Sequence, residues 1–380
     1  MKIAVVCDVL GVANNGTTIA ALNLINSLKA KGHEVRVLCP DEDKKDIDGY
    51  YVMPKVNFLF LNNYVAKNGV ALSRPVRKKI CEALDGVDAV HVMTPFFLGI
   101  AARKYAVSHG VPLTAGFHCQ AENFTSHIFL MNNGRFNRAV YRFFWNNLYK
   151  YCDCIHYPTQ FICDTFEEIV GETPHRIISN GVHDEFVPCD EEELHGTDTF
   201  RILFIGRFSK EKSHPVLVKA AALSKHRDKI QLVFAGDGPQ KTHVKNECKK
   251  LGLRDPEIGF FSRKDLLDII YSADLYVHPA EIEIEAIACL EAISCGKVPV
   301  ISDSPRCATK HFALGEQNLF KYNDPTDLAE KIDYWIENPE KRKECRKEYL
   351  GFAEDYRFSA CMDKMEKMIV GTAEEKCKKK

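Results

Sequence analysis

The sequence predicts an α/β protein of two Rossmann-like domains, and three observations support this. The chain has 380 residues, a length that suits two domains of about 150–200 residues each. Hydrophobic residues make up 46% and charged residues 27%, as in chains that bury a core. Short apolar runs alternate with helical patterns in two successive sets. We therefore expect domains over residues 1–184 and 185–355, with two parallel sheets facing each other across a cleft.

The first set of elements covers the N-terminal half of the chain. It opens with the strand pattern IAVV, followed by a stripe of apolar residues at helical spacing within residues 17–31. Gly32 ends this helix, and the strand pattern VRVL follows it. The patterns AVHVM, PLTAGFH and CIHYP continue the alternation, with helical stretches between them, so a parallel sheet is predicted.

The second set follows a polar segment, SNGVHDEFVPCDEEELHGTD, which starts at Ser179 and is rich in acids and turn formers. Its strand patterns are RILFIG, KIQLVFAG, IGFF, DLYVHP and VPVIS. A last helix over about residues 356–372 is expected to pack back on the N-terminal domain.

The charge is unevenly distributed along the chain. A net charge of −1 excludes a protein that binds polyanions over its whole surface. The stretch from Gly99 to Cys152 nevertheless contains six basic residues, one acid and many aromatic residues. This composition favours contact with an anionic surface. No nucleic-acid-binding motif accompanies it, so we expect no nucleic-acid partner.

The 15 cysteines are odd in number and scattered through apolar runs, which favours buried thiols in a reducing compartment. Cys152, Cys154 and His156 alternate as in a strand, and no second ligand pair follows, so we expect no zinc site. The sequence contains no secretory signal pattern and no apolar run of the ~18–20 residues that span a bilayer. We expect a cytoplasmic protein, peripherally associated with the inner face of the cell membrane.

Two glutamates in the segment EIEIEAIACLEAISCGKVPVI give the sharpest local signal. Glu283 and Glu291 would lie about 12 Å apart along a helix. Paired carboxylates of a glycoside hydrolase need ~5–9.5 Å, so that reaction is disfavoured. The two residues suit the ends of an elongated ligand such as a nucleotide sugar, with the helix N-terminus facing its pyrophosphate. A solvated acidic helix start, including Glu281 and Glu285, is the alternative.

The segment from Glu283 to Glu291 resembles the E-x(7)-E signature of the retaining glycosyltransferases of family 4. The segments GRFSKEK and GDGP resemble the phosphate loop and the Gly-x-Gly-Pro turn of that family. ADLYVHPA and SNGVHDEF resemble its strand before the acidic helix and its interdomain linker. The matches keep the family's order over nearly the whole chain, so the resemblance implies the GT-B fold.

The sequence departs from the family pattern in three places. Ile284, Glu285 and Ala286 stand where the family has Gly-Phe-Gly after the first glutamate. Asn15 replaces the first of two loop glycines, and Ser213 replaces the glycine that follows the loop's lysine. We expect Glu285 to point away from the phosphates.

The resemblance implies a nucleotide-sugar site that needs neither a cofactor nor a metal ion. It assigns catalytic roles to His118, Arg207, Lys212 and Glu283. Fixed cations there stabilise the charge that develops on a nucleotide diphosphate leaving group. On its own, a histidine such as His118 favours a structural role; the resemblance places it beside the sugar. The residues implied for nucleotide-sugar binding are Gly16, Gly206, Gly238, Glu283, Ile284, Glu285, Ala286 and Glu291.

The run HCQAEN resembles the His-x-Gln-Pro-Glu-Asn motif of diacylglycerol glycosyltransferases, with Ala121 in place of proline. This resemblance implies acceptor-side roles for Glu122, Asn123 and His127.

The segment GRFNRAVYRFFWNNLYK predicts an amphipathic helix. Its expected apolar face consists of Phe136, Val140, Phe143, Phe144 and Leu148. Its other face carries Arg135, Arg138, Arg142 and Tyr149. Such a helix suits an anionic membrane interface, contacted by Arg135, Arg138, Arg142 and Trp145. An ordinary core-packed helix with a solvated face is the alternative.

Together these features predict a retaining hexosyltransferase that moves sugar from a nucleotide sugar, UDP-glucose or similar, to a membrane lipid such as diacylglycerol. The resemblance implies a front-face reaction in which the leaving phosphate assists deprotonation of the acceptor. The alternatives are a family 4 enzyme with a soluble or polysaccharide-precursor acceptor, a GT-B nucleotide-sugar epimerase and a non-catalytic membrane adaptor. An NAD dehydrogenase is disfavoured because no G-x-G-x-x-G follows the first strand.

Overall fold

The computed structural model describes residues 1–10, 16–57, 72–126, 133–189 and 199–378. It divides into two compact units. Unit 1 comprises Met1–Asn180 and Cys361–Lys380, and unit 2 comprises Gly181–Ala360. The chain passes from the first unit to the second after Asn180, near the division expected at residue 184.

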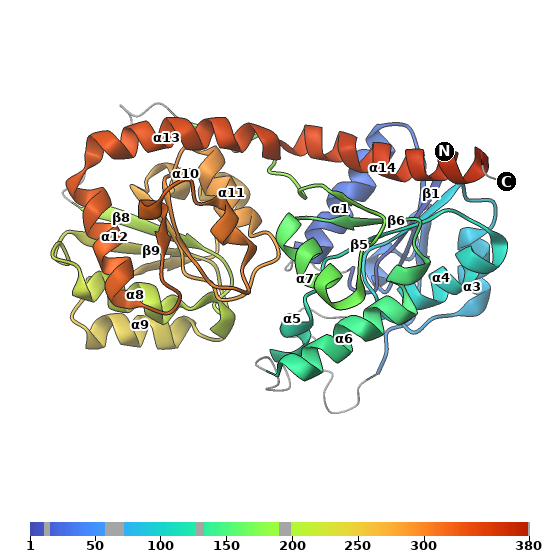
Figure 1. Ribbon diagram of the computed structural model, residues 1–380, viewed down its shortest axis with the longest axis horizontal. Helices are drawn as coiled ribbons and strands as arrows, with labels where there is room; N and C mark the ends of the chain where they lie inside the picture. The colour runs from blue at the N-terminus through green and yellow to red at the C-terminus, as the bar shows by residue number, and fades with distance from the viewer. Residues whose placement is uncertain (11–15, 58–71, 127–132, 190–198, 379–380) are drawn as a thin grey trace. The chain divides into compact units, whose positions relative to one another are not determined.

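The described residues of unit 1 form a seven-stranded parallel sheet in the order β3-β2-β1-β4-β5-β6-β7, with helices on its faces (Figure 1). The strands are β1 (Lys2–Val6), β2 (Glu34–Cys39), β3 (Tyr50–Val52), β4 (Ala89–Val92), β5 (Leu113–Gly116), β6 (Cys154–Tyr157) and β7 (His175–Ile177). The helices are α1 (Gly16–Ala30), α3 (Arg77–Leu84), α4 (Phe97–His109), α5 (Ala121–Ser126), α6 (Gly134–Asn147), α7 (Gln160–Val170) and α14 (Phe358–Lys378). The strand order reverses at β1, and ligands of such sheets bind outside the carboxyl ends of the strands at this point.

The described residues of unit 2 form a six-stranded parallel sheet in the order β10-β9-β8-β11-β12-β13. Its strands are β8 (Phe200–Ile205), β9 (Ile230–Ala235), β10 (Glu257–Gly259), β11 (Leu275–His278), β12 (Pro299–Ser302) and β13 (Leu319–Phe320). Its helices are α8 (His214–Leu223), α9 (Lys241–Lys250), α10 (Arg263–Tyr271), α11 (Ile287–Ser294), α12 (Pro325–Glu337) and α13 (Pro339–Ala353). The strand order again reverses beside the first strand of the unit, so both units have Rossmann-like topology.

The central strands supply most of the core of each unit. Every residue of β4, β5, β6, β11 and β12 is buried, which explains why these strands appear in the sequence as continuous apolar runs. In unit 2 the rings of Phe204, Phe208 and Phe234 pack around the buried His214. This aromatic cluster lies directly behind the loop that follows β8.

Helix α14 belongs to unit 1 from Cys361 onward. His33 Nε2 lies 2.8 Å from Glu366 Oε1, and Lys376 Nζ donates to Asp153 Oδ2 at 2.7 Å. Apolar side chains of the helix are buried as well. Within the described ranges, no helix is both long and apolar enough to cross a membrane.

Candidate active site

The residues implied for nucleotide-sugar binding in unit 2 follow three strands of one parallel sheet. Gly206 and Arg207 follow β8, Gly236 and Gly238 follow β9, and Glu283 follows β11. Because the strands are parallel, their carboxyl ends meet at the same edge of the sheet. The fold therefore gathers at one edge residues that lie far apart in the sequence.

Two glycine loops approach each other closely at this edge. A Cβ atom on Gly236 would lie 2.0 Å from the carbonyl oxygen of Gly206. Gly238 has φ 151°, and a Cβ there would lie 2.7 Å from the carbonyl oxygen of Phe208. Phe208 N donates to the Asp237 carbonyl at 2.9 Å. Only glycine fits at these contacts, so the sequence sets the spacing between the two loops.

Lys212 and Glu283 form an ion pair at the centre of this edge. Lys212 Nζ contacts Glu283 Oε1, and each side chain is only 17% exposed. Burial raises the pKa of Glu283, but the charge of Lys212 and the neighbouring His278 outweigh it and lower that pKa to about 2. Backbone bonds fix the segment further, because Ala308 N donates to the Glu283 carbonyl at 2.9 Å. The carboxylate is therefore ionised and held in one place.

The expected helix from Glu283 to Glu291 is wrong in its first half. Helix α11 begins only at Ile287, and Glu283 is extended, in a parallel bridge with Cys307. The rise of about 12 Å along a helix therefore does not describe the pair. Glu291 lies within α11, where burial raises its pKa to about 7.

The other acids of this segment do not form a solvated helix start. Glu281 is paired with Arg306, and Glu285 is only 4% exposed. Helix α11 contains no acid in its first turn. Ile284 is half-buried beside them.

Ser213 and Ala286 adopt left-handed backbone conformations, with φ 52° and 57°. These are the positions at which the family pattern has glycine, so the structure retains a backbone that favours glycine although the residue has changed. The left-handed conformation costs an L-residue about 1–2 kcal/mol, and replacement by glycine removes this cost. Part of the gain in stability is then lost, because glycine increases the entropy of the unfolded chain.

We expect Ser213→Gly and Ala286→Gly each to raise the free energy of unfolding by about 0.5–1 kcal/mol, measured by urea denaturation. Asn323, at φ 58°, is the matched control, because asparagine tolerates this conformation and Asn323→Gly should gain less. Equal gains at all three positions would contradict the explanation.

In unit 1, His118 lies two residues beyond the end of β5 and not at the strand end itself. Its ring covers Gly116, since a Cβ there would lie 2.4 Å from His118 Nε2. The His156 ring centroid is 5.4 Å away. Burial lowers the pKa of His118 well below its usual range, so the ring is neutral. Thr17 Oγ1 donates to the His118 carbonyl at 3.4 Å, which brings the first turn of α1, with Gly16, beside it.

The acceptor-side candidates lie in or just after α5. Glu122 accepts hydrogen bonds from Asn137 Nδ2 at 3.2 Å and Tyr141 Oη at 2.8 Å, so its carboxylate joins α5 to α6. Asn123 lies in α5, and His127 lies outside the described residues. Within unit 1, Glu122 therefore holds α5 against α6.

The expected apolar face of α6 is only partly right. Phe144 is buried, but Phe136 and Phe143 are 36% and 51% exposed. The buried stripe instead contains Asn137 and Tyr141, because Glu122 satisfies their polar groups.

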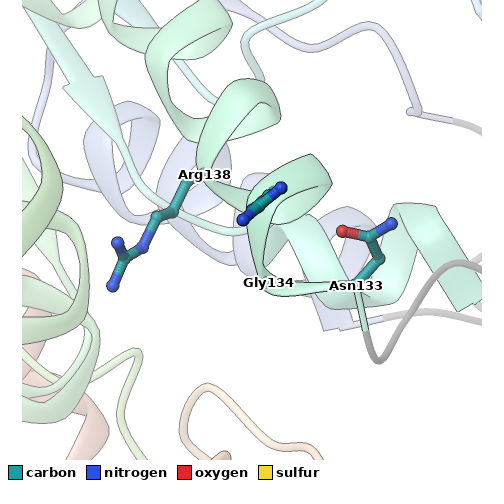
Figure 2. A pocket seen from close by; sticks show the side chains of 4 residues that line it. Asn133, Gly134 and Arg138 are labelled. Carbon is teal, nitrogen blue, oxygen red and sulfur yellow. The ribbon is translucent and has the colours of Figure 1, made fainter.

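The outer face of α6 combines cations with aromatic rings. Arg135, Arg138 and Arg142 are all exposed, next to the two exposed phenylalanines. Trp145 is half-buried against Phe166, with ring centroids 6.3 Å apart. A hollow of about 650 Å³ at the start of the helix is lined by Asn133, Gly134, Arg135 and Arg138. Figure 2 shows the Arg138 guanidinium extending away from the helix into this hollow.

Among the described residues, Cys163, Glu167 and His175 come close enough to share a metal ion. Glu167 Oε1 already accepts bonds from Thr173 N and Thr173 Oγ1 at 3.0 and 2.6 Å and lies 2.9 Å from His175 Nδ1. These contacts tie the end of α7 to β7 and give the cluster a structural explanation.

His278 is a residue that the sequence patterns assigned only to a strand. It ends β11, and its Nε2 lies 3.5 Å from Glu283 Oε1. The signal available in the sequence was its position at the carboxyl end of a buried strand, two residues after Tyr276.

Comparison with known families and structures agrees with this geometry. Residues 14–186 match the model "Glycosyltransferase Family 4", and residues 190–349 match "Glycosyl transferases group 1". The chain is 23% identical to alpha-monoglucosyldiacylglycerol synthases of Streptococcus pneumoniae and Acholeplasma laidlawii. The matches cover 80% and 86% of this chain and 71% and 86% of those proteins.

Two further matches name different nucleotides. A GDP-mannose-dependent alpha-mannosyltransferase of Mycolicibacterium smegmatis is 26% identical over 80% of this chain and 79% of its own. The crystal structure of Anabaena Alr3699/HepE in complex with UDP matches with a TM-score of 0.78 at 16% identity, covering 98% of this chain and 100% of that one.

Proposed function

Because this chain belongs to the family 4 glycosyltransferases and has the GT-B architecture of two α/β units, we propose a specific reaction for it. The enzyme transfers a hexose from a UDP-sugar to a hydroxyl of a membrane lipid such as diacylglycerol, with retention at the anomeric carbon. The observation that carries this proposal is the buried Lys212–Glu283 pair beside two closely packed glycine loops.

In this proposal unit 2 binds the nucleotide sugar. The exposed Arg207 and the Lys212 of this ion pair stabilise the diphosphate as its negative charge grows. Glu283 binds hydroxyl groups of the sugar, and Glu291 binds the ribose. A UDP-sugar is supported by the UDP complex of the structural neighbour, whereas the mannosyltransferase names GDP-mannose. No step of the proposed reaction uses a metal ion.

The lipid acceptor is supported by two independent features. Two relatives, whose matches cover 80% and 86% of this chain, are named for a glucosylated diacylglycerol. The outer face of α6 presents three arginines and two phenylalanines, which suits the interface of an anionic membrane. We propose that unit 1 binds the acceptor and associates peripherally with this surface.

The proposed chemistry is a front-face displacement. The bond between the anomeric carbon and the phosphate oxygen breaks, and the acceptor oxygen bonds to that carbon on the same face. The acceptor proton passes to the leaving phosphate. His118 is neutral and lies beside the first turn of α1, so it can contribute a hydrogen bond without adding charge.

The test is incubation with a panel of UDP- and GDP-sugars and diacylglycerol, with mass spectrometry of the lipid fraction and NMR of the product anomer. We expect a hexosyl lipid with the anomeric configuration of the nucleotide sugar. Conversion of the nucleotide sugar without acceptor would indicate an epimerase instead. Transfer to a water-soluble sugar alone would assign a different acceptor, and intact nucleotide sugars after long incubation would favour a non-catalytic adaptor.

A further inference from the structure

We propose that His278 is a positioning residue for Glu283 and that Tyr276 fixes the tautomer in which it acts. The inference rests on the proposed function only in giving Glu283 the sugar as its ligand. The three side chains form a chain of contacts that begins in the core of unit 2 and ends at the edge of the sheet.

The contacts follow from the strand geometry. Tyr276 and His278 are two residues apart in β11, so their side chains point to the same face of the sheet. Both are buried, at 0% and 1% exposure. Tyr276 Oη lies 3.0 Å from His278 Nδ1, and His278 Nε2 lies 3.5 Å from Glu283 Oε1. Within the described residues His278 Nε2 makes no hydrogen bond, and its 3.5 Å approach to Glu283 Oε1 is the polar contact that it has.

These distances select one tautomer of His278. Burial lowers the pKa of the ring, so it is neutral and carries a single N–H. With that proton on Nδ1, the lone pair of Nε2 would face the carboxylate of Glu283, which is repulsive. With the proton on Nε2, the Tyr276 hydroxyl donates to Nδ1 and the N–H points at Glu283. Only the second arrangement directs an N–H, and not a lone pair, at the carboxylate.

The arrangement divides the two oxygens of Glu283 between protein and substrate. Lys212 Nζ and His278 Nε2 both approach Oε1. Both of these contacts are made to the same oxygen, and neither is made to Oε2. With the ammonium of Lys212 bound to Oε1 and the N–H of His278 directed at the same oxygen, the carboxylate cannot rotate freely, so Oε2 is oriented toward a hydroxyl of the sugar. We infer that His278 sets the orientation of the Glu283 carboxylate, whereas Lys212 keeps that carboxylate ionised.

The experiment compares His278→Phe, His278→Gln and Tyr276→Phe. Phenylalanine keeps a ring of similar shape without the N–H, whereas the glutamine amide can again donate to Glu283. For His278→Phe we expect kcat/KM for the nucleotide sugar to fall about 10- to 100-fold. The Kd of the free nucleotide should stay unchanged, because Glu283 contacts only the sugar. His278→Gln should recover much of the loss, and Tyr276→Phe should fall between them.

A second readout needs no turnover. Nitrogen-15 NMR of histidine-labelled protein reports the tautomer, and the His278 signal is assigned by its absence in His278→Gln. We expect the Nε2–H form in the wild type and a mixture of tautomers in Tyr276→Phe. Tyr349→Phe is the matched control, because this buried hydroxyl accepts the backbone N–H of Leu314 at 3.1 Å and does not belong to the contacts between Tyr276, His278 and Glu283.

Two results would overturn the inference: an Nδ1–H tautomer in the wild type, or wild-type kcat/KM in His278→Phe. A wild type that turns over no nucleotide sugar would instead contradict the proposed function, and the NMR result would still decide the role of His278.

Discussion

Replacing Lys212 with methionine is expected to reduce sugar transfer by about 10²- to 10³-fold, because it removes a fixed cation from the developing diphosphate charge. Glu283→Gln is expected to cause a loss of similar size, since an amide cannot replace the carboxylate that accepts the sugar hydroxyl. Methionine and glutamine preserve the volume of the original side chains. Initial rates under saturating nucleotide sugar are the measurement.

The stability of these variants separates the fold from the chemistry. Each single change leaves one buried charge without its partner, which costs about 3–5 kcal/mol for a pair of this kind. The double variant Lys212→Met/Glu283→Gln removes both charges and should regain much of that stability while remaining inactive. Urea denaturation and activity are measured on the same samples.

Arg201→Met is the control for this pair. Arg201 forms two hydrogen bonds to Glu257, at 2.8 and 2.7 Å, in the same unit, and it lies at the start of β8, whereas the glycine loop follows the end of that strand. The Arg201→Met variant should have a lower free energy of unfolding than the wild type and should keep its transferase activity. A double variant that transfers sugar at the wild-type rate would remove Lys212 and Glu283 from the site.

The central strands of both sheets were predictable, because a parallel strand covered on both faces is a continuous apolar run. The edge strands β3, β7 and β13 are short, contain no such run and were not predicted. The edge at which the site forms was also predictable, since residues that follow parallel strands meet there. Gly206, Gly238 and Lys212 were predicted from the resemblance of their segments to family motifs, and the structure places them near this edge. The close packing of the loops after β8 and β9 explains why both motifs contain glycine.

The rest depended on contacts between distant segments. Glu283 lies outside α11 because its backbone pairs with the segment around Cys307, which no local helical pattern reveals. The buried face of α6 contains Asn137 and Tyr141 because Glu122, on another helix, accepts their hydrogen bonds. Helical periodicity predicts that polar residues face solvent, and it does not show that a distant residue satisfies their hydrogen bonds. The predicted apolar face of α6 therefore included Phe136 and Phe143, which are exposed.

That correction sharpens the proposal for the membrane. Had the phenylalanines been buried, α6 would offer a membrane only charge. The described helix instead exposes Phe136 and Phe143 beside three arginines, so rings can enter the acyl boundary while cations remain at the headgroups. Both kinds of contact contribute to binding, and they respond differently to the composition of the membrane.

The triple variant Arg135→Glu/Arg138→Glu/Arg142→Glu is expected to lose binding to anionic vesicles by 100-fold or more. Each cation near an anionic surface contributes about 1 kcal/mol, so removing three costs about 3 kcal/mol, and reversing them adds repulsion. Vesicle flotation with phosphatidylglycerol at low salt measures the partition. The wild type should lose binding as salt increases, because the attraction is screened.

The matched control reverses three exposed lysines of α9, Lys245, Lys249 and Lys250, which changes the net charge by the same amount on a helix without Phe, Tyr or Trp. It should float with anionic vesicles as the wild type does, because the attraction belongs to one face and not to total charge. The double variant Phe136→Ser/Phe143→Ser should weaken binding at every salt concentration, because it removes apolar contacts that salt does not screen. If both charge reversals bind equally, the outer face of α6 is an ordinary solvated surface, and the proposed association of unit 1 with a membrane is wrong.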